Sequence, residues 1–251
     1  MIRLSALVAV VFCLHVAFSA TLPFMCQNLL DGAVISMEET MESTAKPEGS
    51  MVTLKCNVFG SPQAAVEWFH NGTLLERHNA PVVEAIANRR SAEWLGMSIQ
   101  NARLRIPCLS KADAGVYTCR AENPCGKGFV EAHAEVAVLP RAVGAGSCAP
   151  EAALAPLISL YTSSRLEVEQ NKIQLQCRSK GPAGFVQWAV ADDQGDFFHA
   201  IEKFAFVQKL PNNDLLIDAS GIEKASMTFQ CSITNQFGTD AVESTIVLLT
   251  N

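Results

Sequence analysis

One stretch near the middle of the chain, residues 104–126, constrains the fold more than any other. It reads LRIPCLSKADAGVYTCRAENPCG. Leu104 and Ile106 alternate with polar neighbours, which is the period-two pattern of a half-buried strand. After the tight turn at residues 113–115, a second alternation places Cys119 on a buried face. The stretch therefore predicts two strands joined by a short turn, with a buried cysteine on the second strand.

The spacing of this motif resembles the E strand, tyrosine corner and F strand of an immunoglobulin domain of the I-set. The partners that such a sandwich requires lie upstream. Cys56 sits in an alternating strand, and Trp68 follows twelve residues later, where it would pack on an intersheet disulfide between Cys56 and Cys119. With Tyr117 as the corner tyrosine, the sequence predicts one immunoglobulin sandwich over residues 33–140.

The second half of the chain repeats this pattern with departures. Cys177, Trp188 and Cys231 keep the same order and similar spacing, which predicts a second sandwich over residues 157–251 with an intersheet disulfide Cys177–Cys231. Phe229 replaces the corner tyrosine, so the core is filled but a hydroxyl hydrogen bond worth ~1 kcal/mol is missing. The predicted fold class is all-β, with two tandem immunoglobulin-like sandwiches of the I-set.

The ends of the chain indicate a secreted protein. Residues 4–18 are nearly all apolar and follow the single charge of Arg3, and small residues precede a predicted cleavage after Ser19. We therefore interpret residues 1–19 as a signal peptide, with a retained membrane anchor as the alternative. The apolar run at residues 246–249 is too short for a membrane or lipid anchor. We expect an extracellular, released protein.

Composition agrees with that compartment. The chain has nine cysteines, which suits an oxidising environment. Its charge is mixed, with 19 basic and 25 acidic residues and no basic patch, which argues against a nucleic-acid partner.

Four cysteines of the mature chain remain outside the intersheet pairs: Cys26, Cys108, Cys125 and Cys148. Four cysteines allow three pairings. In an immunoglobulin topology, Cys26 and Cys125 lie at one end of the first sandwich and Cys108 and Cys148 at the other. The ends are roughly 20 Å apart, whereas a disulfide requires Cα atoms within about 7 Å. We therefore predict Cys26–Cys125 and Cys108–Cys148.

These bridges would restrain the segments that flank the first sandwich. Residues 20–32 are predicted to form an N-terminal extension, and residues 141–156, rich in Ala, Gly and Pro, a linker. A bridge at Cys148, within the linker, leads us to expect the two domains in an extended line.

Little in the sequence points to catalysis. The histidines are scattered, and no Gly-x-Ser-x-Gly nucleophile motif occurs. The spare cysteines lack the close pairs of a zinc site, although metal binding is the competing interpretation of them. We expect a non-enzymatic protein without a cofactor. Asn71-Gly72-Thr73 is a glycosylation sequon and also an Asn-Gly hairpin turn, which would expose Asn71.

Two apolar stretches lie outside the core motif. One contains Trp94, Leu95 and Met97, and the other contains Phe204 and Phe206. One interpretation is an additional strand and extra core. The other is an exposed apolar edge that binds a partner or the other domain. The sequence leaves both open.

A signal peptide, two immunoglobulin domains and extra cysteines in the first domain resemble the secreted zwei Ig proteins of nematodes. That resemblance implies a neuronally secreted factor that maintains axon position and nerve cord organisation through contacts with extracellular or cell-surface proteins. The plan is also similar to that of the insect secreted two-domain protein that sequesters insulin-like peptides. The alternative function is therefore a soluble binder and antagonist of insulin-like peptides.

Overall fold

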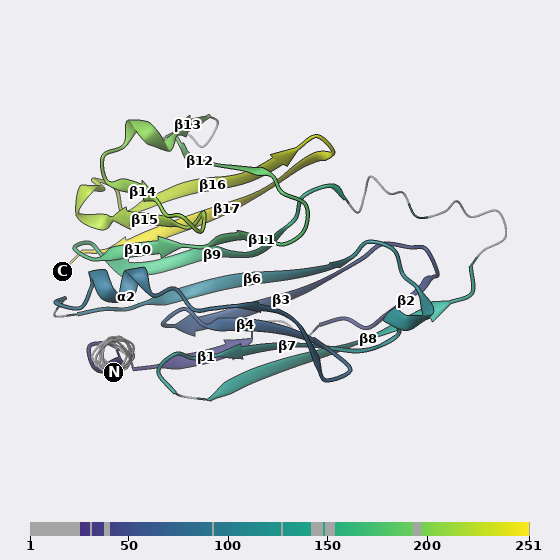
Figure 1. Ribbon diagram of the computed structural model, residues 1–251. Coiled ribbons are helices and arrows are strands. Elements are labelled where there is room, and N and C mark those ends of the chain that lie inside the picture. The colour runs from purple at the N-terminus through teal and green to yellow at the C-terminus, as the bar shows by residue number, and fades with distance from the viewer. Residues whose placement is uncertain are drawn as a thin grey trace, which may run out of the picture.

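The structure is a computed structural model that describes residues 26–30, 32–37, 41–91, 93–126, 128–141, 148, 154–192 and 197–250. The predicted signal peptide at 1–19 and most of the predicted linker lie outside the described residues. Within the described ranges the chain is almost entirely β-structure arranged as two sandwiches, which confirms the predicted fold class (Figure 1).

The first sandwich has a five-stranded sheet with the order β2-β8-β7-β4-β5, and a facing layer with the order β1-β3-β6. Its elements are β1 (Val34–Met37), β2 (Thr44–Pro47), β3 (Val52–Ser61), β4 (Ala65–His70), β5 (Thr73–His78), α2 (Val83–Ala87), β6 (Met97–Ile106), the 3₁₀ turn η1 (Lys111–Asp113), β7 (Gly115–Glu122) and β8 (Phe129–Leu139).

The second sandwich pairs a three-stranded sheet, β10-β15-β14, with a layer that runs β9-β17-β16-β12-β13, in which β11 also pairs with β9. Its elements are β9 (Ile158–Val168), β10 (Lys172–Leu175), β11 (Cys177–Ser179), β12 (Phe185–Ala191), β13 (Phe198–Ala200), η2 (Ile201–Lys203), β14 (Val207–Lys209), β15 (Leu215–Asp218), η3 (Ala219–Gly221), β16 (Ser226–Asn235) and β17 (Gly238–Leu249).

The corner motif folds as its spacing predicts. Along β6 and β3, buried and exposed residues alternate, because successive side chains of a strand point to opposite faces. Tyr117 is buried, and its hydroxyl donates a hydrogen bond of 3.0 Å to the backbone oxygen of Asp113. Burial of the hydroxyl and, to a smaller extent, the nearby Asp113 charge raise the pKa of Tyr117 to about 12. The hydroxyl therefore keeps its proton and remains a donor.

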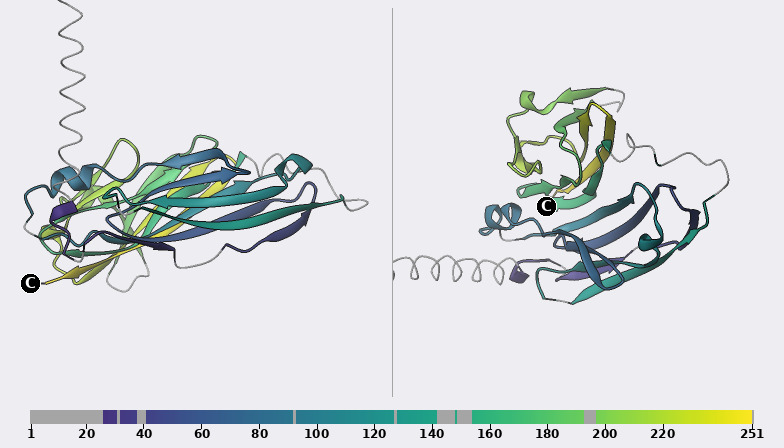
Figure 2. Two further views of the ribbon diagram at one scale, coloured as in Figure 1. Left: turned by 90° about the horizontal axis from the view of Figure 1, so that it is seen from below. Right: turned by 45° about the vertical axis from the view of Figure 1, so that its right-hand side comes forward.

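The arrangement of the two sandwiches differs from the expected extended line. β6 of the first sandwich pairs antiparallel with β9 of the second, from Met97↔Leu166 to Ala102↔Leu160. The two sandwiches therefore lie side by side and share a nine-stranded sheet (Figures 1 and 2). The expectation was wrong because it treated each sandwich as self-contained, whereas the edges of β6 and β9 satisfy each other's backbone groups.

A bulge divides the contact between β6 and β9. The register shifts between Ile99 and Gln100, so that Ser163 of β9 has no opposite residue. Before the bulge, Leu160 points into the first sandwich and completes its core. After it, Arg165 aligns with Ser98 on one side and Ile246 on the other, on the face that carries both cores.

We predict that Tyr117→Phe lowers the free energy of unfolding by ~1 kcal/mol, because it deletes only the hydroxyl that bonds the E–F turn. Urea denaturation measures this loss. Tyr161→Phe is the matched control, because the Tyr161 hydroxyl makes no hydrogen bond within the described residues. Equal losses for both variants would contradict the corner's role.

Candidate functional site

A short helix closes the junction between the two sandwiches. α2 lies against β10 (Figure 1). Glu84 of α2 is only 2% exposed and bonds residues of the second sandwich. The Glu84 carboxylate accepts hydrogen bonds from Arg165 Nη2 at 2.5 Å, from the backbone N–H of Gln174 at 2.7 Å and from Trp94 Nε1 at 3.3 Å. A single carboxylate therefore joins α2 to two strands of the second sandwich.

A second carboxylate reaches from the second sandwich to the first. Glu167, fully buried on β9, accepts the backbone N–H groups of Leu95 at 3.0 Å and Gly96 at 2.9 Å. Arg165 lies between the two acids, 3.3 Å from Glu167 Oε2, and also donates to the Gly96 oxygen. We call Glu84, Arg165 and Glu167 the junction triad.

Amide side chains continue the junction along the sheet. Gln100 Nε2 donates to Gln176 Oε1 at 2.6 Å, and Gln63 Nε2 donates to the Gln174 oxygen at 2.7 Å. Thr162 Oγ1 donates to Gln63 Oε1 at 2.7 Å. All these side chains are buried. Because buried polar groups are costly without partners, this set stabilises only one alignment of the sandwiches.

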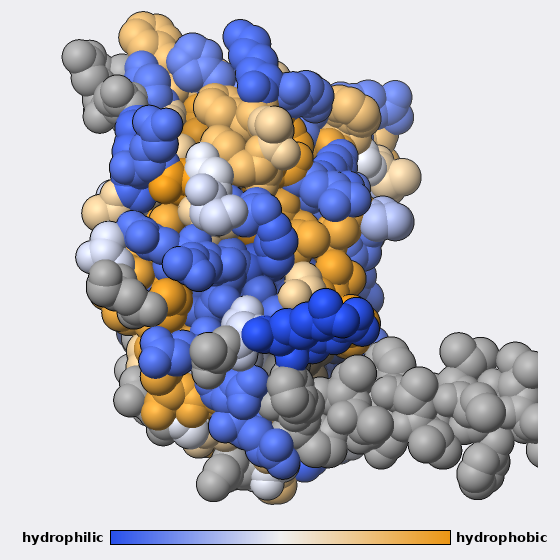
Figure 3. All heavy atoms as spheres, turned by 90° about the vertical axis from the view of Figure 1, so that its left-hand side faces the viewer, coloured by the Kyte–Doolittle hydropathy of each residue, from blue (hydrophilic) through white to orange (hydrophobic). Residues whose placement is uncertain are grey.

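Peripheral contacts close both sides of the junction. Asn88 and Lys172 exchange two hydrogen bonds of 2.7 Å. At the other end, Arg103 Nη2 lies 2.6 Å from Asp240 Oδ2. In Figure 3, which views the end of the molecule that carries α2, hydrophilic side chains cover much of the middle, with apolar areas above and below them.

The pKa values of two buried glutamates, Glu84 and Glu76, shift in opposite directions. Burial raises the pKa of the Glu84 carboxyl, the Arg165 charge opposes that shift, and the Glu167 charge adds to it. Glu76 shows the opposite direction. Burial raises its pKa, but the hydrogen bond and charge of His78 and the charge of Lys180 together lower it below the usual value.

The face of the nine-stranded sheet opposite both cores is open. One row of aligned residues on it runs Phe59, Ile99, Ser164, Thr245 and Thr228 across five strands. A second row runs Met97, Leu166, Val247 and Ser226. We define the joint-sheet face as Phe59, Met97, Ile99, Ser164, Leu166, Thr228, Gln230, Ser232, Ala241, Glu243, Thr245 and Val247.

Charge distinguishes this face from the other large outer face of the molecule. Glu243 is the one charged member of this set, which mixes small polar with partly exposed apolar side chains; Lys55, Arg103 and Arg105 lie beside the set on the same side of β3 and β6. The outer face of the five-stranded sheet instead carries ion pairs, such as Arg77–Glu67 at 2.7 Å and Arg120–Glu131 at 3.9 Å. Depletion of charge together with exposed apolar area is typical of protein interfaces.

The predicted apolar contact residues separate into three environments. Trp94 and Leu95 are 3% and 5% exposed, so the prediction that they form an exposed contact surface is wrong. Trp94 packs instead on Leu29 and Cys125, and its neighbours bind the second sandwich. Phe204 and Phe206 pack against the core of the second sandwich, and extra core is therefore their role. Met97 remains half-exposed, on the joint-sheet face.

The structure brings the predicted cysteine pairs together. Cα–Cα separations are 5.6 Å for Cys26–Cys125, 6.4 Å for Cys56–Cys119, 5.6 Å for Cys108–Cys148 and 6.5 Å for Cys177–Cys231.

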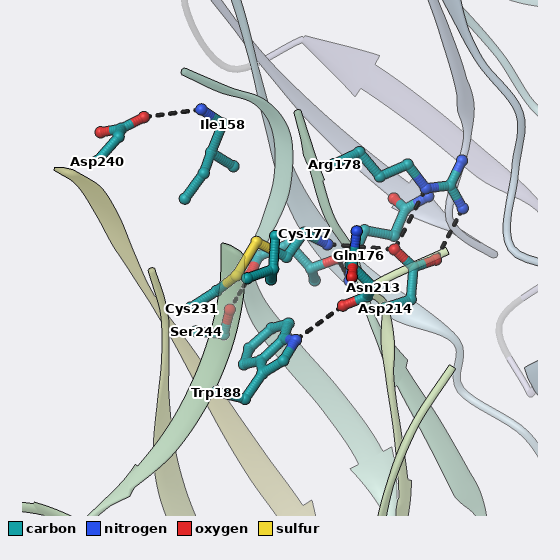
Figure 4. The surroundings of a disulfide bond; sticks show 12 residues. Ile158, Gln176, Cys177, Arg178, Trp188, Asn213, Asp214, Cys231, Asp240 and Ser244 are labelled. Carbon is teal, nitrogen blue, oxygen red and sulfur yellow. Dashed lines mark hydrogen bonds and ion pairs between the residues drawn. A yellow bond between two sulfur atoms is a disulfide. The ribbon is translucent and has the colours of Figure 1, made fainter. Parts of the chain in front are cut away.

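The predicted core aromatics Trp68, Tyr117, Trp188 and Phe229 are all buried. Figure 4 shows Trp188 beside the second intersheet disulfide, donating to the Asn213 oxygen at 2.8 Å. Asp214, also drawn there, accepts from Arg178 Nη2 and from the Cys177 N–H, at 2.8 and 3.2 Å.

The sequon lies in the expected turn. Asn71 is exposed and has a positive φ of 48°, and Gly72 follows at 79°. Its Oδ1 accepts the Val116 N–H at 3.0 Å, which ties this turn to the E–F corner. Glycosylation of Asn71 stays a prediction.

The junction triad was missed from the sequence. Glu84 lies within the apolar run VVEAIA, and an isolated acid in such a run was the available signal. Arg165 and Glu167 alternate with apolar residues, so they had the pattern of a solvent-facing strand surface.

Two further properties concern chemistry and membranes. Among the described residues, no group of three or more His, Cys, Asp or Glu side chains is placed to hold a metal ion. No helix in the described ranges has the length and apolar character needed to cross a membrane.

The fold and the paired cysteines define an immunoglobulin-domain protein. The immunoglobulin I-set domain model matches residues 35–138. The chain is 30% identical over 210 residues to the zwei Ig domain protein zig-4 of Caenorhabditis elegans, covering 84% of this chain and 78% of that protein. It is 28% identical to zig-3 of the same organism, covering 80% and 75%. The chain therefore belongs to the zwei Ig family.

A solved structure shares the fold of nearly the whole chain. The neural ectodermal development factor IMP-L2 aligns with a TM-score of 0.59 and 19% identity, covering 88% of this chain and 97% of that one.

We predict that Arg165→Met lowers the free energy of unfolding by about 3–5 kcal/mol, because it leaves two carboxylates buried without their common cation. Urea denaturation at pH 7 measures the loss. Arg77→Met is the control, because the Arg77 side chain in the Glu67 pair is 55% exposed, and such pairs contribute about 0–1 kcal/mol. Similar losses for both variants would contradict a central role for Arg165.

The Glu84 carboxyl predicts a pH dependence. A carboxyl whose pKa is raised in the folded state stabilises the fold while protonated, and this contribution is lost as pH rises through the folded-state pKa. Glu84→Gln keeps the shape and never ionises. The stability of the wild type should therefore fall relative to Glu84→Gln as the pH rises above 4.5, the usual pKa of a glutamate carboxyl. If the stability of the wild type instead rose relative to that of Glu84→Gln with increasing pH, the raised pKa of Glu84 would be refuted.

Proposed function

We propose that the protein is a secreted, non-enzymatic factor of the nervous system that maintains axon position by binding an extracellular or cell-surface protein. Membership of the zwei Ig family supports the proposed role as a secreted factor of the nervous system. The weakly charged joint-sheet face carries the binding proposal, because it spans both sandwiches and contrasts with the ion-paired outer face of the five-stranded sheet.

The joint-sheet face has the features of a recognition surface. Its two aligned rows place the apolar side chains of Phe59, Met97, Ile99, Leu166 and Val247 on four neighbouring strands. Neighbouring strands lie ~4.8 Å apart, so four strands present a patch about 15 Å across. Small Ser and Thr side chains beside it let a partner backbone approach closely.

The second candidate is a soluble binder of insulin-like peptides. The half-exposed apolar rows favour it, because a small disulfide-bonded peptide with an apolar surface fits a face of this size. Both candidates use the joint-sheet face, and they differ only in the partner.

We predict that purified protein binds a member of a panel of neuronal surface ectodomains in a saturable manner, and that Ile99→Arg with Leu166→Arg weakens this binding at least tenfold. Each arginine would place an unpaired charge in an apolar contact. Biolayer interferometry against the panel and against insulin-like peptides provides the measurement. His133→Arg, on the charged outer face, is the control and should leave binding unchanged.

The outcomes separate the proposals. Binding to insulin-like peptides alone would replace the first candidate with the second. Binding that survives both arginines would exclude the joint-sheet face as the site.

A further inference from the structure

The strand at the outer end of the first sandwich is only partly covered. β1 pairs with β3 over Val58–Ser61 alone, whereas β6 pairs with β3 on its other side from Val52 onwards. Along 52–57, no other described strand pairs with the free side of β3. An unpaired strand edge presents backbone N–H and C=O groups to an incoming strand.

Residues 41–47 are held away from this edge. Met41 is 9% exposed and packs into the first core. Ser43 Oγ then accepts the Glu135 N–H at 2.9 Å, and β2 pairs in parallel with β8 up to Pro47↔Leu139. Residues 41–47 are therefore committed to the opposite sheet.

The following turn closes one end of the space between the two segments. The Gly49 N–H donates to the Leu109 oxygen at 2.7 Å, and the Leu109 N–H donates to the Ser50 oxygen at 2.8 Å. A groove of about 480 Å³ remains between residues 41–46 and residues 51–55. We call it the β3 edge groove.

Charge in the groove selects the kind of strand that it can accept. Lys46 and Lys55 line it and are exposed, Glu42 is its one acid, and Met51 is 52% exposed. In the described part of the chain, neither lysine forms an ion pair. These two lysines would repel a basic strand, whereas an acidic strand would satisfy both the free backbone groups of β3 and the two positive charges.

We propose that the β3 edge groove binds an extended acidic segment of a protein partner, which adds a strand to the nine-stranded sheet. The segment runs along Val52–Asn57, so six residues, about 20 Å of strand, fill the edge. Backbone hydrogen bonds supply the affinity and the two lysines supply the specificity. This site is separate from the joint-sheet face and does not depend on the partner proposed there.

Fluorescence anisotropy with two labelled hexapeptides tests the proposal. One peptide alternates Glu and Thr, and the other alternates Lys and Thr. We expect saturable binding of the acidic peptide and at least tenfold weaker binding of the basic one. Lys46→Glu with Lys55→Glu should invert this preference, and Lys111→Glu, an exposed lysine of η1 outside the groove, should leave it unchanged.

Hydrogen exchange locates the bound peptide independently. Amides of residues 52–57 that do not bond β6 should gain protection when the acidic peptide is added. The proposal is overturned if the acidic peptide does not bind saturably, if the charge reversals leave its affinity unchanged, or if protection appears only outside the β3 edge groove.

Discussion

The architecture depends on one buried guanidinium shared by two carboxylates. Arg165 lies between Glu84 of the first sandwich and Glu167 of the second, and all three side chains are at most 2% exposed. Buried ions are strongly unfavourable without partners. If the sandwiches separated or slid, Arg165 would lose Glu84, and Glu167 would lose the Leu95 and Gly96 N–H groups. The junction triad therefore acts mainly through specificity, because it allows one relative placement of the two sandwiches.

That placement creates the surface to which we assign binding. The rows of the joint-sheet face cross from β6 to β9, so each row contains residues of both sandwiches. Domains in an extended line would present the two halves on separate surfaces. The bulge at Ser163 supports the same arrangement, because it turns Leu160 into the first core and Leu166 outward onto the joint-sheet face.

The sequence was sufficient for each sandwich and insufficient for their packing. Alternation, the corner motif and the Cys–Trp–Cys spacing depend on contacts within one domain, so they predicted the strands around Cys56 and Cys177. Gln174 and Gln176 alternate with the buried residues of β10 and β11, as solvent-facing residues would. Alternation distinguishes the two faces of a strand, but it cannot distinguish water from a second domain. Trp94 was ambiguous for the same reason, because an aromatic side chain outside the core motif suits either a partner or a junction.

Small-angle X-ray scattering of the protein without residues 1–19 tests whether the two sandwiches share one sheet. We expect a single compact particle whose pair-distance distribution has one maximum and whose profile matches two sandwiches side by side. An elongated particle with two maxima, one within each domain and one between them, would contradict the shared sheet and the junction triad that fixes it.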